Sequence, residues 1–300
     1  NEETGENLMS GMGELHLEII EGRIKTEKGL EVKMGHPIVV YRESVSKDSG
    51  GKTEVRTPNG HNILFFAIEP LEDEVYNAIE RGELPEMRLK KKADDIWKKL
   101  NELGLSNDEA RQYLEIYKGN VFEDRTRGIV LLPEAIESIL EGWRMVIDGG
   151  PLAKEPMMKT KLILLDAKLH VDHMHRGPAQ IYPVLRLGMH ETMKKAGAVM
   201  LEPIQTHLIE APVEFMGTVT QLVGSKRGVL IDVKQEGNDT FIKARIPVAE
   251  MIGWSNDLRG SNEGRGISSL MDQNFQKVPT DLQPNVVRTI RQRKGLAENQ

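Results

Sequence analysis

The last third of the chain carries an order of secondary structure that few folds accommodate. Between residues 202 and 279 the sequence predicts strand, helix, strand, strand, helix, strand, with Gly237-Asn238-Asp239 as the turn between the central strands. The strands are predicted at 206–213, 229–235, 241–247 and 266–275, and the helices at 214–225 and 249–259. This order, βαββαβ, is typical of a ferredoxin-like domain. We therefore expect a separate α+β domain over this stretch.

Residues 35–201 are expected to form a second α+β domain. Ser106 and Glu109 have the spacing of a helix capping box. Pro133 suits the first turn of a later helix, and Gly149 suits its end. Strands are expected at 38–42, 63–67 and 161–171, with a further helix at 183–196. The tail, 280–300, has apolar residues at helical spacing and is expected to dock on a neighbouring domain.

Residues 1–34 are predicted to form only part of a domain. A helix over 13–26 lies between two short strand-like segments, which makes a β-α-β piece without its complement. We therefore expect the apolar side chains of Leu15, Ile19 and Leu30 to be exposed.

Composition narrows the class of protein. The chain has 300 residues, of which 39% are apolar, and it has no cysteine, so disulfides and thiolate chemistry are excluded. No apolar run reaches the roughly 20 residues that span a bilayer, and we expect a cytoplasmic protein with no membrane partner. A net charge of −6 does not suggest a nucleic-acid binder, but the basic residues cluster at 88–99 and 288–294. Such local patches can contact RNA, although the first is better explained as the solvated face of a helix.

Three histidines, His170, His173 and His175, fall within six residues between a predicted strand and a predicted helix. One interpretation is a metal site that also uses Asp172, as in a metal-dependent hydrolase. A closed metal site needs three or four converging ligands, and the spacing of these residues does not favour such convergence. A second is a loop whose histidines satisfy local hydrogen bonds, and a third is a recognition loop. Asp172 would repel phosphate, and we assign it to loop geometry or to recognition by modifying enzymes.

The sequence contains no nucleotide-binding motif. The pattern Gly-x-x-x-x-Gly-Lys-[Ser/Thr], which cradles nucleotide phosphates, does not occur. The glycine-rich stretch 260–266 follows a predicted helix and contains no lysine, so it is interpreted as a helix-to-strand loop. We therefore predict no catalytic residue, no bound metal and no enzymatic activity for these 300 residues.

Short motifs along the whole chain resemble translation elongation factor 2 of archaea and eukaryotes. Leu169-His170-x-Asp172 followed by His175-Arg176-Gly177 and Gln180 resembles the family's tip loop, whose histidine becomes diphthamide. Bacterial elongation factor G lacks that histidine, which favours the archaeal and eukaryotic branch. Further resemblance, in chain order, lies at 10–18, 58–62, 149–152, 217–228, 257–259, 264–266 and 293–296.

The resemblance implies a domain plan and a function. Residues 1–34 would be the C-terminal half of a ferredoxin-like domain III, 35–201 an S5-like split β-α-β domain IV on which 280–300 packs, and 202–279 domain V. The chain would be the C-terminal, monomeric part of a factor that promotes GTP-dependent translocation of tRNA and mRNA on the ribosome. GTP and Mg²⁺ would bind in an N-terminal domain, and no cofactor is expected here.

The resemblance also implies site residues. His175 would be modified to diphthamide by dedicated synthesis enzymes. Contacts with RNA in the decoding site would involve His170, His173, Arg176, Gln180, Asn59, His61 and Asn62. In domain V, Arg259 and Arg265 would be candidates for ribosome contact.

Overall fold

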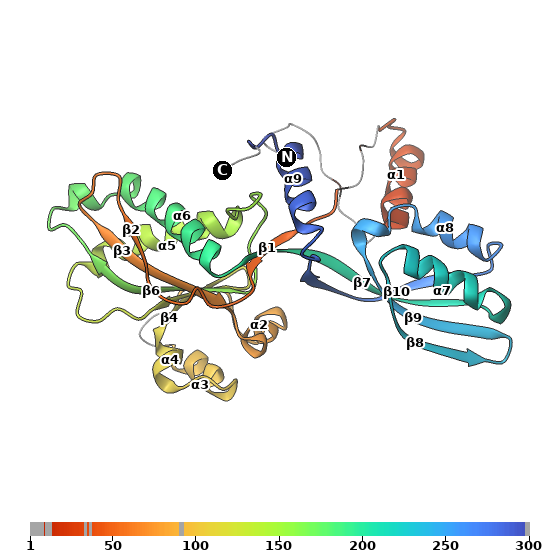
Figure 1. The fold of residues 1–300 in the computed structure, drawn as a ribbon, viewed down its shortest axis with the longest axis horizontal. Helices are drawn as coiled ribbons and strands as arrows, with labels where there is room; N and C mark the ends of the chain where they lie inside the picture. Colours follow the sequence, from red (N-terminus) through yellow and green to blue (C-terminus); the bar gives the residue numbers. More distant parts are fainter. Residues whose placement is uncertain (1–8, 10–13, 33–34, 36–37, 90–92, 298–300) are drawn as a thin grey trace. The chain divides into compact units, whose positions relative to one another are not determined.

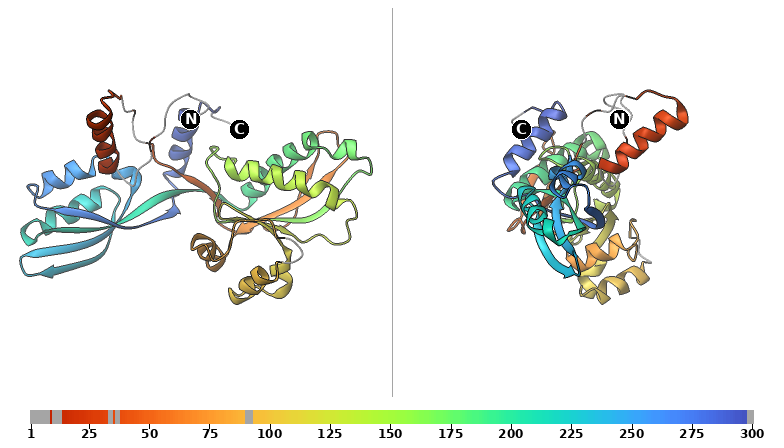
Figure 2. Two further views of the ribbon diagram at one scale, coloured as in Figure 1. Left: turned by 180° about the vertical axis from the view of Figure 1, so that it is seen from behind. Right: turned by 90° about the vertical axis from the view of Figure 1, so that its right-hand side faces the viewer.

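A computed structural model describes residues 9, 14–32, 35, 38–89 and 93–297. The chain divides into two compact units, drawn in Figures 1 and 2. The ferredoxin-like unit comprises residues 1–40 and 202–276, and the loop-bearing unit comprises 41–201 and 277–300. Both combine helices with a β-sheet, so the predicted α+β class is confirmed. Among the described residues, no helix is long and apolar enough to cross a membrane.

The ferredoxin-like unit has the predicted order βαββαβ. Its elements are β7 (Ala198–Pro212), α7 (Met216–Ser225), β8 (Val229–Glu236), β9 (Asp239–Pro247), α8 (Trp254–Ser261) and β10 (Ile267–Lys277). Strands pair in the order β10-β7-β9-β8, and the hydrophobic core includes Ile209, Val219, Val223, Ile242 and Trp254. Helix α8 begins five residues later than predicted, because 248–250 form a 3₁₀ turn and Gly253 adopts a left-handed conformation with φ +80°.

Helix α1 (Glu14–Lys28) is the first element that the structure describes. Ile19 and Leu30 are more than half exposed, as the sequence predicted, and the side chain of Leu15 lies outside the described part. The strand expected over 30–34 is absent at 30–32, and residues 33–34 lie outside the described part. The strand expected near 7–10 also lies outside it, apart from Met9.

The loop-bearing unit is built on a mixed five-stranded sheet in the order β2-β3-β6-β5-β4. Its strands are β2 (Thr53–Arg56), β3 (Ile63–Pro70), β4 (Tyr113–Tyr117), β5 (Asn120–Asp124) and β6 (Thr160–Lys168), and β1 (Arg42–Val45) pairs with the start of β7. Its helices are α2 (Asp73–Glu80), α3 (Asp94–Glu102), α4 (Asn107–Gln112), α5 (Leu132–Asp148), α6 (Pro178–Lys195) and α9 (Gln283–Arg293). Helices α5 and α6 cover one face of the sheet, and α3 and α4 lie on the other side (Figure 1).

The main core lies between the sheet and the helices α5 and α6. Trp143 and Phe122 are fully buried there, with ring centroids 5.6 Å apart in an edge-to-face arrangement. Close packing explains Gly188 on α6, because a Cβ at this position would overlap the ring of Phe66. The sheet and the two helices therefore share one close-packed core, and the loops at the strand ends lie at its edge.

Several predicted elements are corrected. Residues 38–41 are not a strand, and the strand begins only at Arg42. Helix α6 begins at Pro178 instead of Pro183, because Gly177 in an extended conformation acts as its N-cap and Pro178 occupies its first turn. The hairpin of β4 and β5 was not predicted. The capping box of Ser106 and Glu109, by contrast, is confirmed.

A buried carboxylate ties β1 to the turn that follows α5. Glu43 is fully buried, and its two oxygens accept hydrogen bonds from the backbone N–H groups of Leu152, Ala153 and Glu155 at 2.7, 2.8 and 3.0 Å. A Cβ on Gly150 would overlap this carboxylate, which explains the glycine there.

Helix α9 and the residues after it are fastened to the same turn. Arg291 donates to the carbonyl of Leu152 at 2.7 Å. Arg293 and Lys294 form ion pairs with Glu155 at 3.2 and 2.8 Å. The turn at 149–155 is thus held by Glu43 on one side and by the tail on the other.

Candidate nucleic-acid interface

Strand register brings two loops together at one edge of the sheet. β3 and β6 are antiparallel, with Ile63 opposite Lys168, so the loop before β3 and the loop after β6 meet. We call residues 57–62 and 169–177 the paired-loop tip. The second loop contains a 3₁₀ turn, His173–Arg176, and leads directly into α6. Residues separated by more than 100 positions in sequence therefore share one site.

Two asparagines of the first loop fix the backbone of the second. The Asn62 amide nitrogen donates to the carbonyl oxygen of His175 at 2.7 Å, and the Asn59 amide donates to the same oxygen at 3.2 Å. The Asn62 amide oxygen accepts from the backbone N–H of His170 at 2.9 Å. The Gln180 side chain accepts from the backbone N–H of Asn59 at 3.0 Å. His175 is therefore held at its backbone while its ring stays partly accessible.

Three imidazoles gather at the tip. The ring centroid of His61 lies 4.5 Å from that of His175 and 5.0 Å from that of His170, and His170 and His175 are 4.7 Å apart. Nδ1 of His170 lies 3.1 Å from the backbone N–H of Asp172 and accepts its hydrogen bond. The sequence predicted two of these histidines from one loop, but not that His61 would stack on both.

The outer surface of the tip is apolar and imidazole-bearing. The His173 side chain is 82% exposed, and Val171 and Met174 are 81% and 73% exposed. Asp172 accepts a hydrogen bond from the backbone N–H of Met174 at 2.9 Å, which lowers the pKa of its carboxyl. The predicted role of Asp172 in loop geometry is therefore confirmed.

Two residues expected to contact RNA are buried instead. Asn62 is fully buried among its hydrogen bonds. Arg176 is 6% exposed, because its guanidinium turns inward to Glu134 at 2.8 Å and to the Val171 carbonyl at 3.1 Å. Both side chains hold the tip together, so they present nothing to a partner in this conformation. Gln180 belongs to the first turn of α6, not to the loop.

The metal interpretation fails on geometry. In the part of the chain that the structure describes, no group of three or more His, Cys, Asp or Glu side chains is arranged to hold a metal ion. His173 points outward, and the nitrogen of His170 is engaged with the backbone. The metal-dependent hydrolase alternative therefore has no support.

The basic candidates of the ferredoxin-like unit differ in their surroundings. Arg265 pairs with Glu214 at 2.6 Å and lies 4.7 Å from the centre of the Phe215 ring. Arg259 is exposed on α8. Asp257, on the same helix, pairs with Lys226 at 2.7 Å.

Replacing Asn62 is expected to loosen the tip. Asn62→Ala leaves the His170 N–H without its buried partner, at about 1–3 kcal/mol for the unsatisfied group, whereas the His175 carbonyl keeps its bond from Asn59. We expect hydrogen exchange at the His170 amide to accelerate in this variant. In Asn62→Asp the carboxylate still accepts from His170, so that amide should stay protected while the bond to His175 is lost. Equal exchange rates in Asn62→Ala and the unaltered chain would contradict this role.

Comparison with known protein families gives a consistent match over three consecutive stretches. The model described as Elongation Factor G, domain III matches residues 1–36, and that of Elongation factor G, domain IV matches residues 85–197. The model described as Elongation factor G C-terminus matches residues 199–298. The second loop of the tip lies within the domain IV match.

Whole proteins give the same match. Proteins named Elongation factor 2 from Thermococcus onnurineus (strain NA1), Thermococcus kodakarensis and Pyrococcus horikoshii are 48%, 47% and 45% identical over 299 residues. The match covers 100% of this chain and 41% of each relative. The chain thus spans about two fifths of the length of these relatives.

Proposed function

Because the chain belongs to the family of elongation factors 2 and G, we propose that it is the part of a translation factor that enters the ribosome during translocation. The paired-loop tip would lead into the decoding site, next to tRNA and mRNA. The observation that carries this proposal is the ordered match of three domains, with the histidine motif on an exposed tip. The tip lies at the edge of the close-packed sheet-and-helix core, which would support it as a lever.

We propose that His175 is the residue converted to diphthamide. Its backbone is fixed by two amide hydrogen bonds, and its partly accessible ring can be reached by the synthesis enzymes. RNA contact would be made by the accessible residues of the tip, His61, His170 and His173, and by Asn59 at the loop edge. Imidazole donors and apolar side chains can read RNA through 2′-hydroxyl groups and base stacking.

The remaining activity would lie in the rest of the parent protein. GTP and Mg²⁺ would bind outside these 300 residues, since the sequence has no phosphate-binding loop. In the ferredoxin-like unit, Arg259 is the better candidate for ribosomal RNA, because Arg265 already pairs with carboxylates. The factor would act as a monomer in the cytoplasm.

The mass of the peptide containing His175 tests this assignment. We expect a mass increase at His175 when the chain is produced in an archaeal host that makes diphthamide, and its loss in His175→Gln. His173→Gln, in the same loop, should keep the modification. The host's own elongation factor 2 in the same sample serves as the positive control. An unmodified His175 beside a fully modified host protein would contradict the assignment.

A further inference from the structure

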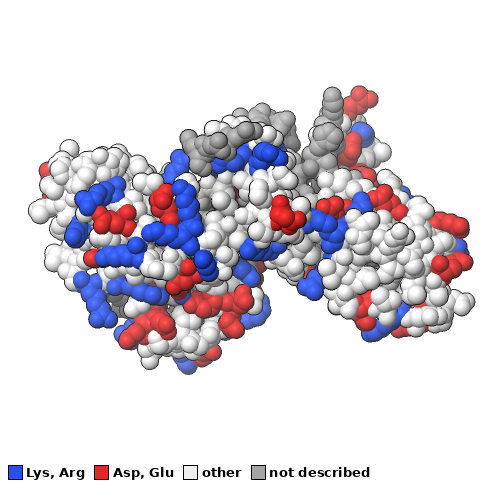
Figure 3. All heavy atoms as spheres, in the orientation of Figure 1, with Lys and Arg blue, Asp and Glu red and all other residues white. Residues whose placement is uncertain are grey.

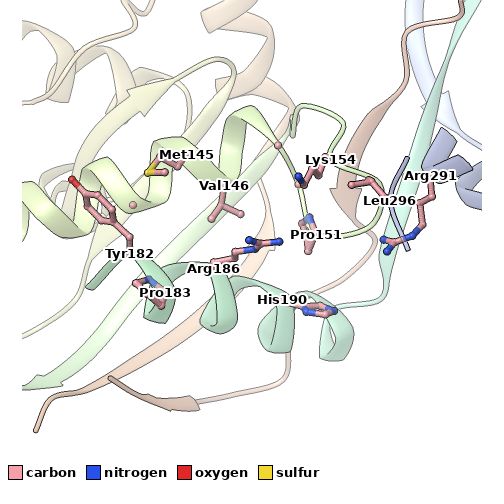
Figure 4. A pocket seen from close by; sticks show the side chains of 13 residues that line it. Met145, Val146, Pro151, Lys154, Tyr182, Pro183, Arg186, His190, Arg291 and Leu296 are labelled. Atoms are coloured by element: carbon pink, nitrogen blue, oxygen red, sulfur yellow. The ribbon is translucent and has the colours of Figure 1, made fainter. Parts of the chain in front are cut away.

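A pocket of about 530 Å³ opens in the loop-bearing unit, between α5, the 149–154 turn, α6 and α9. Figure 4 shows side chains from all four segments around it. Its lining includes Met145, Tyr182, Pro183, Arg186, His190 and Arg291. The volume lies within the roughly 300–1,000 Å³ that small-ligand sites usually have. The pocket is separate from the paired-loop tip, since none of the tip residues lines it.

The pocket walls carry positive charge and no carboxylate. Lys154, Arg186, His190 and Arg291 all line it, whereas no Asp or Glu does, in a chain whose net charge is −6. Lys154 and Arg186 are exposed and form no ion pair with the described residues. Burial and then the nearby Lys194 lower the pKa of His190, Glu191 partly opposes this shift, and Arg186 and Arg291 act in the same direction as burial. Figure 3 shows Lys and Arg side chains interspersed with Asp and Glu on the visible face of this unit.

Arg291 contributes charge without being free to move. Its guanidinium donates to the carbonyl oxygens of Leu152 and Ala297, and the residue is 8% exposed. In the described part of the chain it has no carboxylate partner. Its charge is therefore fixed at the pocket wall, and a bound anion would compensate it. Arg186 reaches from α6 toward Pro151, so its planar guanidinium faces the same space (Figure 4).

The opposite wall is apolar and includes an aromatic ring. Met145, Val146 and Pro183 lie on it beside Tyr182, whose hydroxyl donates to Glu141 at 2.5 Å. This bond holds the ring in place. A ligand for this pocket must therefore combine an anionic group with a flat apolar body.

We propose that the pocket binds one unpaired nucleotide of RNA. The phosphate would lie between Arg186 and Lys154, and the base would lie against Tyr182 and Met145. Guanidinium groups match phosphate geometry, and base stacking on an aromatic ring tolerates any sequence. The choice of RNA as the ligand class rests on the proposed function, whereas the charge and shape of the pocket do not.

Fluorescence anisotropy with a labelled single-stranded hexaribonucleotide tests the proposal on this chain. We expect Arg186→Ala/Lys154→Ala to weaken binding at least tenfold. Losing two phosphate contacts should also lower the slope of log affinity against log salt by about 1.4, at roughly 0.7 per contact. Tyr182→Leu should weaken binding without changing the slope, because it removes the stacking ring and leaves the positive charge intact.

A matched pair controls for general electrostatics. Arg245→Ala/Lys234→Ala removes the same charge from exposed positions of the ferredoxin-like unit and should leave affinity nearly unchanged. Equal weakening by both pairs, or no binding by the unaltered chain, would overturn the proposal. Competition by polyglutamate as strong as by unlabelled RNA would indicate an acidic protein partner instead. Binding of labelled AMP without binding of the hexaribonucleotide would exclude an RNA site.

A failure of the RNA-pocket proposal is distinguishable from a failure of the proposed role in translation. Modified His175 together with unaffected RNA binding by Arg186→Ala/Lys154→Ala would leave the translation role standing and remove the pocket from it.

Discussion

Replacing Lys161 by methionine is expected to destabilise the loop-bearing unit by about 3–5 kcal/mol at pH 7, the range for breaking a buried ion pair. Lys161 is 3% exposed, and its ammonium lies 2.8 Å from Glu69 and 2.5 Å from Glu72. The fully buried Glu123 is 3.9 Å away. Lys161 lies on the sheet face opposite the α5–α6 core, since its neighbour Leu162 points into that core.

The pKa shifts of this cluster agree with its geometry. Burial alone would lower the pKa of Lys161, but the hydrogen bonds to Glu69 and Glu72 outweigh it and the pKa is raised. Burial raises the pKa of Glu123 despite its bonds to Arg125. The Lys161 ammonium thus neutralises part of the negative charge of Glu69, Glu72 and Glu123, which Arg125 alone does not balance. Methionine keeps the volume of the lysine stem but leaves these carboxylates facing one another.

Urea unfolding at pH 5 and pH 8 measures this effect. Without the lysine, the carboxylates gain protons more readily in the folded state, so the deficit of Lys161→Met should be smaller at pH 5 than at pH 8. Lys194→Met is the control, because Lys194 forms an exposed pair with Glu191 at 3.1 Å on α6. Such pairs contribute less than about 1 kcal/mol. A Lys161→Met variant no less stable than Lys194→Met would refute the buried-network interpretation.

Periodicity predicted the elements that have a clear start and end. The βαββαβ order was readable because Gly237 and neighbouring polar residues separate regular apolar repeats. The hairpin at 113–124 was missed because β4 follows α4 without a turn, with Tyr113 both ending the helix and starting the strand. Sequence gives little warning where one element passes straight into another.

The position of the tip could be predicted from the sequence, but which of its side chains are buried and which are exposed could not. Asn62 and His173 are both polar residues of family-like motifs, yet one is fully buried and the other 82% exposed. What separates them is a contact between loops more than 100 residues apart, from Asn62 to His175. The pocket was missed for the same reason, because Arg186 and Arg291 meet only after α9 has packed on the 149–155 turn.

Glu43 controls a part of the fold where long-range contacts converge. It joins β1 to the turn at 149–155, and the tail is fastened to the same turn through Glu155. Burial raises the pKa of Glu43 to about 7, and its three backbone donors only partly oppose this. Near neutral pH the carboxyl group is therefore shared between its protonated and ionised forms. The anchorage of the turn thus depends on pH.

The contribution of Glu43 to the free energy of unfolding is expected to fall as pH rises from about 4.5 through 7. The folded state holds a proton on Glu43 that the unfolded chain has already lost, so the contribution is fully present below the ordinary carboxyl pKa and is lost above about 7. A shift of this size corresponds to roughly 3 kcal/mol. His207, whose pKa burial lowers to about 4, acts in the opposite direction over pH 4 to 6.5. The unaltered chain therefore shows the sum of these two groups and of other shifted groups such as Glu123 and His190.

Subtracting the curve of Glu43→Gln isolates the effect. The amide cannot ionise, so the free energy of unfolding of the unaltered chain minus that of Glu43→Gln should shrink by roughly 3 kcal/mol between pH 4.5 and 8. The variant itself should be less stable at low pH, because its NH₂ group meets one of the backbone donors now served by an oxygen. Glu54→Gln, an exposed carboxylate on β2, should leave the pH slope unchanged. A difference curve for Glu43→Gln as flat as that of Glu54→Gln would mean that the three N–H donors keep Glu43 ionised, and that the turn is anchored equally at every pH.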